Sequence, residues 1–172
     1  LRRMNRKYTP DEFALKVDLI RKFFDNPGIT TDIIAGFPGE SEEEFEESFK
    51  FAEKIRFTQA HIFKYSPRKG TAACGMPDQI PGKIKTERSE RLIALTDRMQ
   101  QEFEAGLEGT VQKILLEEEE NGDDGSGWIT GYTPEYVRTA IPSGRSLPGD
   151  IVQAEISGRV SIGGASVCAA RI

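Results

Sequence analysis

The stretch Thr31-Asp32-Ile33-Ile34-Ala35-Gly36-Phe37-Pro38-Gly39-Glu40 decides the fold of the first part of this 172-residue chain. Its apolar run stops abruptly at a Gly, Pro and Gly turn, a pattern typical of a buried parallel strand that ends in a tight loop. Gly36 and Gly39 permit a sharp turn and a close approach to a small ligand, and Pro38 stiffens the loop. Ligands of parallel α/β sheets lie at the carboxyl ends of the strands, so this loop is the first candidate for a binding site. The alternative, which these residues leave open, is a tight turn without a ligand.

Two capping signals predict helices on either side of this strand. Thr9 is followed three residues later by Glu12, and Ser41 is followed by Glu44 at the same spacing. Both pairs match the capping box, in which two side chains satisfy free backbone N–H groups at a helix start. We therefore expect one helix to begin after Thr9 and a second to cover roughly Glu42–Arg56.

A second strand is predicted at Gln59–Tyr65, so that it forms a right-handed βαβ unit with the first strand, Ile29–Phe37. The polar and basic loop that follows it, Tyr65–Thr71, emerges at the same sheet edge as Gly36–Gly39. The two loops are expected to share one site, in which Arg68 and Lys69 would bind a carboxylate or a phosphate. A solvated loop is the alternative.

A long helix and then a series of short strands follow. The helix is predicted at Lys83–Gly106, with the stem of Arg88 along its apolar face and the charge in solvent. Gly106 and Gly109 mark a domain boundary. Beyond it, five short strands predict a small closed barrel of the oligonucleotide-binding type: Thr110–Leu116, Trp128–Tyr132, Tyr136–Ile141, Ile151–Ile156 and Ser166–Ile172. The acidic run Glu117–Gly125 is expected to be a solvated hairpin loop.

Composition restricts the class of protein. A net charge of −5 and 37% hydrophobic residues suit a globular domain, and no apolar run is long enough to span a bilayer. The two cysteines, Cys74 and Cys168, form neither a disulfide framework nor a metal-ligand pair, and the single histidine, His61, has no partner nearby in sequence. We therefore predict no catalytic residue and no metal ligand, a cytoplasmic location, and a start that was cut from within a longer protein.

The second domain is acidic overall and carries two tyrosines close in sequence to an arginine. From Leu107 onward there are five Lys or Arg against ten Asp or Glu, and six of those acids lie between Glu117 and Asp124. Tyr132, Tyr136 and Arg138 are side chains of the kind that stack on unpaired bases, so we predict them as RNA-binding residues. Ordinary packing of the barrel is the alternative.

Four segments, taken together, resemble the radical S-adenosylmethionine methylthiotransferases: Met4–Tyr8, Thr31–Glu40, Phe63–Thr71 and Gly131–Val137. The resemblance spans essentially the whole chain and implies an α/β fold. Residues 1–105 would be the last βα units of a radical S-adenosylmethionine partial barrel, and residues 106–172 would be a small all-β TRAM domain.

The resemblance also implies a function. Members of this family add a methylthio group to a modified adenosine beside the tRNA anticodon, using S-adenosylmethionine and two [4Fe–4S] clusters. The segments Met76–Pro81 and Gly131–Pro134 look most like the branch that acts on N6-threonylcarbamoyladenosine. The expected partners are the tRNA anticodon stem-loop and S-adenosylmethionine, with no membrane. The branch that modifies isopentenyladenosine, a ribosomal-protein aspartate methylthiotransferase, an RNA base methyltransferase and a non-catalytic RNA-binding module are the alternatives.

The site residues that the resemblance carries over to the cofactor are Gly36, Phe37, Pro38, Gly39, Glu40, Tyr65, Ser66 and Arg68. Asp32 stands where the family's Gly-x-Ile-x-Gly motif has its first glycine. The family's Cys-x-x-x-Cys-x-x-Cys motif is absent, so this chain alone is expected to bind neither cluster and to be inactive. The strand edges of a partial barrel predict a dimer.

Overall fold

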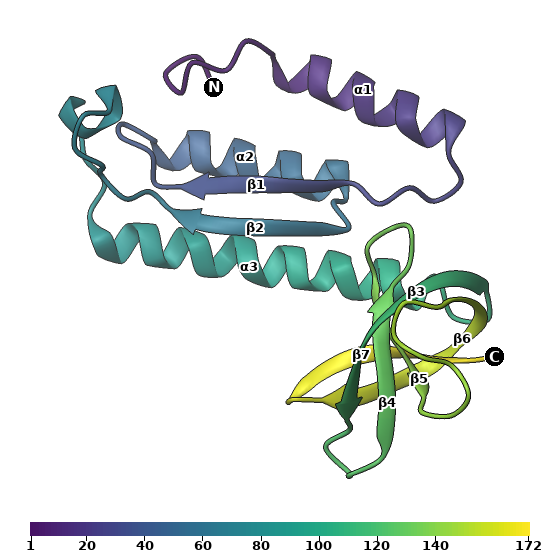
Figure 1. Cartoon of the computed structure of the whole chain (residues 1–172). Coiled ribbons are helices and arrows are strands. Elements are labelled where there is room, and N and C mark those ends of the chain that lie inside the picture. Colours follow the sequence, from purple (N-terminus) through teal and green to yellow (C-terminus); the bar gives the residue numbers. More distant parts are fainter. The chain divides into compact units, whose positions relative to one another are not determined.

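The computed structural model describes residues Leu1–Ile172, which divide into two units, Leu1–Gln100 and Gln101–Ile172 (Figure 1). The elements of the first unit are α1 (Pro10–Phe23), β1 (Thr30–Ala35), α2 (Glu42–Ile55), β2 (Gln59–Lys64), the 3-10 helix η1 (Ala72–Gly75) and α3 (Gly82–Ala105), whose last turn belongs to the second unit. β1 and β2 are parallel, with Thr30 opposite Gln59 and Ala35 opposite Lys64. The predicted α/β class is confirmed. None of the helices combines the length and the apolar character that crossing a bilayer requires.

Both predicted capping boxes are present. The Thr9 hydroxyl accepts a hydrogen bond from the backbone N–H of Glu12 at 3.2 Å, and the Glu12 carboxylate accepts one from the N–H of Thr9 at 2.8 Å. Ser41 and Glu44 repeat the arrangement at 3.2 and 3.0 Å. These bonds satisfy the free N–H groups of the first turn, which fixes the starts of α1 and α2 and hence where β1 ends.

The helices of the first unit cover one face of the two-stranded sheet. Ile33 and Ile62 point toward them and pack against buried clusters. These clusters consist of Ala14, Val17, Ile29, Ala52, Ile55, Phe57, Leu95 and Met99 in one group and Ala35, Phe45 and Leu92 in the other. Side chains alternate along a strand, so the other face carries the exposed Ile34 and Phe63, which are register partners.

The second unit is a closed five-stranded barrel. Its strands are β3 (Val111–Asn121), β4 (Gly127–Tyr132), β5 (Arg138–Pro142), β6 (Ile151–Ile162) and β7 (Ala165–Arg171), in the order β3-β4-β5-β7-β6. The β5–β7 pair is parallel and the other pairs are antiparallel. Leu107, Ile114, Leu116, Ile129, Val137, Ile141, Ala154, Ile156, Cys168 and Ala170 fill the interior, and Phe103 packs against them.

The prediction of a long acidic hairpin loop is wrong. Residues 117–121 continue β3, and only residues 122–126 form the turn to β4. Glu118 pairs with Thr130 and Glu120 with Trp128, after a register shift between Leu116 and Glu118. A strand on the surface of a barrel can carry charged residues because its outer face stays in water, so a run of glutamates does not exclude a strand.

Candidate functional site

The loops after β1 and β2 lie side by side and form a rim at one end of the first unit. Gly36 and Gly39 both have positive φ angles, of 74° and 75°. A Cβ atom on Gly36 would lie 2.3 Å from Cγ of Lys85. Glycine is therefore required at Gly36 both by the backbone conformation and by the space.

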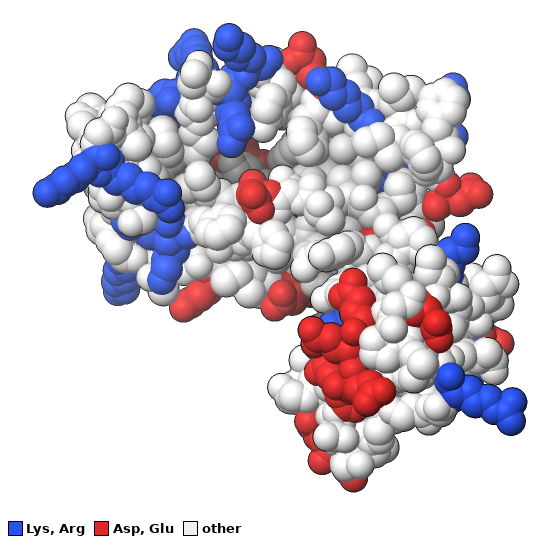
Figure 2. Space-filling view, in the orientation of Figure 1, with Lys and Arg blue, Asp and Glu red and all other residues white.

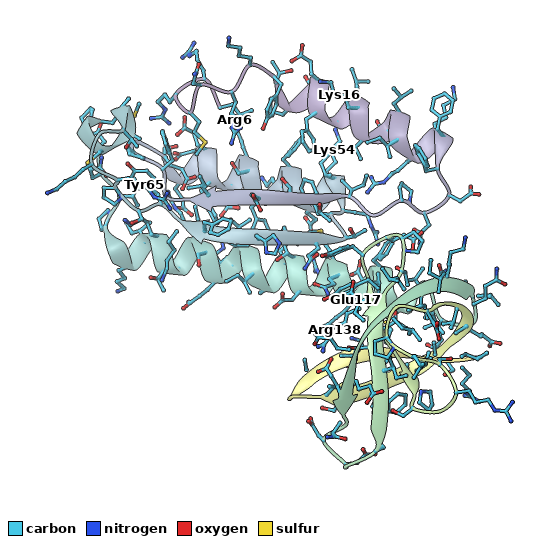
Figure 3. All side chains as sticks on the ribbon, viewed as in Figure 1. Arg6, Lys16, Lys54, Tyr65, Glu117 and Arg138 are labelled. Atoms are coloured by element: carbon cyan, nitrogen blue, oxygen red, sulfur yellow. The ribbon has the colours of Figure 1, made fainter.

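Aromatic rings join the two loops of the rim. The rings of Phe37 and Tyr65 meet edge to face, with their centroids 5.4 Å apart. The backbone N–H of Tyr65 donates to the carbonyl of Ala35 at 2.9 Å, and Nζ of Lys85 donates to the carbonyl of Tyr65 at 3.0 Å. The Tyr65 hydroxyl is shielded from solvent and has no hydrogen-bond partner within the chain. Figure 3 shows this residue directly after β2.

Glu40 holds the loop from within. Its carboxylate accepts the backbone N–H of Gly36 at 2.9 Å and Nη1 of Arg88 at 2.7 Å. Arg88 also donates to the carbonyl of Glu40 at 2.9 Å and, through Nη2, to Glu42 at 2.9 Å. The N–H of Gly36 and the carbonyl of Glu40 are thus both hydrogen-bonded, which holds the two ends of the Gly36–Glu40 segment. The Glu40 carboxylate stabilises the loop through these bonds and is not free.

The prediction that the Arg88 charge lies in solvent is wrong. Arg88 is only 4% exposed, and its guanidinium lies over the ring of Phe45 at 5.2 Å. Burial alone would lower its pKa, but the hydrogen bonds to Glu42 and Glu40 outweigh burial, so the pKa of Arg88 is raised. Sequence reasoning missed Arg88 as a site residue. The signal was present, because a charged residue at an apolar-face position of a helix needs a buried partner.

The outer part of the rim is basic and open. Ser66 and Arg68 are exposed, and the carbonyl of Arg68 accepts the Thr71 hydroxyl at 2.8 Å. Arg3 reaches the rim from the N-terminal segment, donating to the carbonyl of Pro38 at 3.2 Å and pairing with Glu44 at 2.8 Å. Figure 2 shows Lys and Arg side chains gathered over the end of the first unit that carries this segment. An anionic group would be attracted to this end.

The rim has the features that a nucleoside-containing cofactor requires. Two aromatic rings provide flat apolar contact, the glycines allow the backbone to come close, and the Tyr65 hydroxyl lacks a partner that a polar atom would supply. These residues therefore fit S-adenosylmethionine.

The chain's own residues do not fit an iron–sulfur cluster. Such clusters are held by sets of cysteine thiolates. Cys74 lies in the first unit and Cys168 in the second, and no group of three or more His, Cys, Asp or Glu side chains is arranged to hold a metal ion. Burial raises the pKa of Cys168 to about 11, which keeps it a neutral thiol.

A second candidate surface lies on the barrel, where β4 turns into β5. The rings of Tyr132 and Tyr136 are stacked, with centroids 4.7 Å apart and planes inclined by 21°. Arg138 is the register partner of Tyr132, and its guanidinium pairs with Glu120. Glu120 also accepts the Thr130 hydroxyl at 2.6 Å, and these two partners lower its pKa, Thr130 the more strongly. The structure thus brings the three predicted RNA-binding residues together.

The chain thus combines an α/β unit, whose two strand-end loops meet in a rim, with a closed five-stranded barrel that carries a stacked tyrosine pair, which places it among two-domain α/β-plus-barrel proteins. No protein-family model matches it. Curated relatives do. A threonylcarbamoyladenosine tRNA methylthiotransferase of Bacillus subtilis is 38% identical over 156 residues, which are 91% of this chain and 35% of the relative.

Two further relatives are named tRNA-2-methylthio-N(6)-dimethylallyladenosine synthase. The protein of Corynebacterium urealyticum is 42% identical over 91% of this chain and 29% of its own length, and that of Aquifex aeolicus is 39% identical over 89% and 34%. The chain spans about a third of the length of these relatives. It belongs by sequence to the tRNA methylthiotransferase family, which confirms the predicted resemblance.

Proposed function

We propose that this chain is the part of a tRNA methylthiotransferase that holds S-adenosylmethionine at the rim and contacts RNA through the barrel. The observation that carries the proposal is identity of 38% and 42% over 91% of the chain to proteins that bear this activity in their names. On this proposal residues 1–105 are the end of a radical S-adenosylmethionine domain and residues 106–172 are a TRAM domain. The protein acts in the cytoplasm, where its tRNA substrate is found.

The rim residues take separate roles. Phe37 and Tyr65 give the adenosine part of the cofactor an aromatic contact, and the Tyr65 hydroxyl donates to one of its polar atoms. Glu40 and Arg88 hold the Gly36–Gly39 turn in place. Ser66 and Arg68 face the charged end of the ligand. S-adenosylmethionine, when bound, supplies the methyl group and the radical for methylthio transfer.

The cysteines that bind the two [4Fe–4S] clusters lie, on this proposal, in the remainder of the full-length protein. The two cysteines of this chain are far from forming a ligand set. The chain by itself is then inactive, and its task is to orient cofactor and substrate.

The substrate we propose is N6-threonylcarbamoyladenosine beside the anticodon, the modified nucleoside in the name of the Bacillus subtilis relative. N6-dimethylallyladenosine is the second candidate, because relatives of 42% and 39% identity are named for it. A ribosomal-protein aspartate has no such support among these names.

The test is made on the full-length protein, reconstituted anaerobically with iron and sulfide and incubated with tRNA. Mass spectrometry of the digested tRNA should show a methylthio derivative of one of the two bases, and the 172-residue chain should give none. A full-length protein that holds no cluster would contradict the proposal and favour a non-catalytic RNA-binding module. Clusters without modification of either nucleoside would contradict the proposed substrate and favour a ribosomal-protein aspartate.

Cofactor binding is tested separately on this chain. Calorimetry with S-adenosylmethionine should show binding that Phe37→Ala weakens. Phe23→Ala, which removes an equally large ring that is 71% exposed on α1, should leave it unchanged. Equal effects of the two substitutions would exclude the rim.

A further inference from the structure

The face of the two-stranded sheet that the helices leave open carries a regular set of side chains. Figure 1 shows α2 behind β1 and β2, and no element of the first unit in front of them. Side chains alternate along a strand, so this face presents every second residue of each strand. Its members are register partners, which follow one another toward the rim in the order Thr30 with Gln59, Asp32 with His61, and Ile34 with Phe63. The open face therefore leads directly into the rim formed by the loops after β1 and β2.

Asp32 and His61 form a polar pair on this face. Both side chains are exposed, and neither has a hydrogen-bond or ion-pair partner within the chain. They are the only ionisable side chains of the open face, because Lys64 belongs to the other face of β2 and donates to the Thr86 hydroxyl at 3.4 Å. Aspartate is disfavoured within strands, so the fold alone does not explain Asp32. The pair offers a carboxylate acceptor beside an imidazole that can donate.

Ile34 and Phe63 form an apolar pair between the polar pair and the rim. Ile34 is 40% exposed and Phe63 is 51% exposed. Successive residues on one face of a strand are about 6.6 Å apart, so the apolar pair lies one step from the polar pair and one step from Tyr65. Small-molecule sites commonly combine an apolar contact with a few polar groups that fix the orientation of the ligand.

We propose that Asp32 and His61 recognise the N6 substituent of the nucleoside that is modified, whose base lies on the apolar pair beside the cofactor. This inference rests on the proposed function, which places S-adenosylmethionine at the rim. His61 donates to the carboxylate of a threonylcarbamoyl group, and Asp32 accepts from its hydroxyl or from an N–H. A dimethylallyl group has no hydrogen-bonding atom and would leave both side chains without a partner beneath the ligand, which weakens binding. The polar pair thus selects N6-threonylcarbamoyladenosine over N6-dimethylallyladenosine.

The first test compares two anticodon stem-loop RNAs that are identical except for these two nucleosides. The cluster-loaded full-length protein should have the higher kcat/KM for the threonylcarbamoyl RNA. His61→Leu should lower that kcat/KM by roughly 10- to 100-fold, the loss of one hydrogen bond to a charged group, and leave the value for the dimethylallyl RNA unchanged. Asp32→Leu should act in the same direction, and Asp32→Asn, which keeps an acceptor oxygen, should lose less. Gln59→Leu, one step farther from the rim on the same face, is the matched control and should leave the ratio unchanged.

The second test uses the 172-residue chain and needs no cluster. His61 is the only histidine, so its imidazole gives a single resonance in an NMR spectrum. Titration with N6-threonylcarbamoyladenosine should move this resonance, whereas N6-dimethylallyladenosine should leave it in place. Asp32→Leu should reduce the shift.

Three results would overturn the inference. One is a His61→Leu protein in which both RNAs lose kcat/KM equally or neither does. Another is a full-length protein that prefers the dimethylallyl RNA, and the third is a His61 resonance that neither nucleoside moves. A full-length protein that holds no cluster, together with a resonance that only the threonylcarbamoyl nucleoside moves, would refute the proposed function and leave this inference standing.

Discussion

Replacing Arg88 by methionine should unfold the first unit more easily without disturbing the barrel. The substitution keeps the apolar stem and removes the guanidinium. The Glu40 carboxylate, which is 13% exposed, would then keep only the Gly36 N–H as a partner. An uncompensated buried charge is among the most costly local defects in a protein.

The magnitude follows from the burial of the two pairs that Arg88 makes. Breaking a buried ion pair from one side costs about 3–5 kcal/mol, whereas an exposed pair contributes about 0–1 kcal/mol. The Glu42 side chain is 58% exposed and adds little. Since Glu40 keeps one hydrogen bond and slight contact with water, we expect about 3 kcal/mol. Arg88→Met combined with Glu40→Gln should cost clearly less than the sum of the single substitutions.

Urea unfolding separates the two units because Trp128, the only tryptophan, lies in β4 of the barrel. Far-UV circular dichroism, dominated by the helices, should shift in Arg88→Met, while the tryptophan fluorescence transition should stay in place. Arg98→Met is the matched control on the same helix, since Arg98 is 58% exposed and pairs with Glu53. A loss below about 1 kcal/mol for Arg88→Met, equal to that of the control, would refute the buried-network interpretation.

Three further predictions follow. The pKa of Glu120 is lowered in the folded barrel, so the ionised carboxylate stabilises the barrel above pH 4.5, its ordinary pKa, and this stabilisation is lost as the pH falls. Glu120→Gln should therefore make the melting temperature of the barrel fall less steeply in acid. A pH profile identical to that of the wild type would contradict this prediction. Burial raises the pKa of Cys168 to about 11, so a thiol reagent at neutral pH should modify only Cys74 as long as the chain is folded. Rapid reaction of both cysteines in the folded chain would be inconsistent with the closed barrel. β1 and β2 each leave one edge unpaired, so sedimentation should reveal a dimer as concentration rises, and a monomer throughout would rule out edge pairing.

Local patterns in the sequence predicted the elements well. Ser41 and Glu44 specify a helix start within four residues, and the Gly36–Gly39 turn specifies a strand end, because the interactions concerned lie close together in the chain. The five barrel strands were located for the same reason, because each contains an apolar run bounded by a turn, but β3 and β6 extend beyond their predicted ends at Leu116 and Ile156, to Asn121 and Ile162.

Long-range interactions escaped prediction. The partner of Arg88, Glu40, is 48 residues away, so the spacing of α3 places Arg88 on the apolar face but does not identify the carboxylate that pairs with it. The glutamates of β3 were misjudged as loop because charge alone does not distinguish a loop from the outer face of a strand. The left-handed conformation of Tyr136 is set by the turn and not by the residue, so no propensity scale would assign it.

The two candidate sites share a chemical arrangement that bears on what each can bind. Each joins an aromatic pair, Phe37 with Tyr65 or Tyr132 with Tyr136, to a residue of positive φ and to an arginine already neutralised by a glutamate. Arg88 holds the backbone of the Gly36–Glu40 turn, whereas Arg138 pairs with the side chain of Glu120. On the proposed function, the aromatic rings are the part of each site that meets an uncharged heterocycle, while Ser66 and Arg68 meet the charged end of the cofactor. On that proposal, adenine in the cofactor and a base of the RNA are both heterocycles of this kind, and one chain would bind the two with the same type of contact.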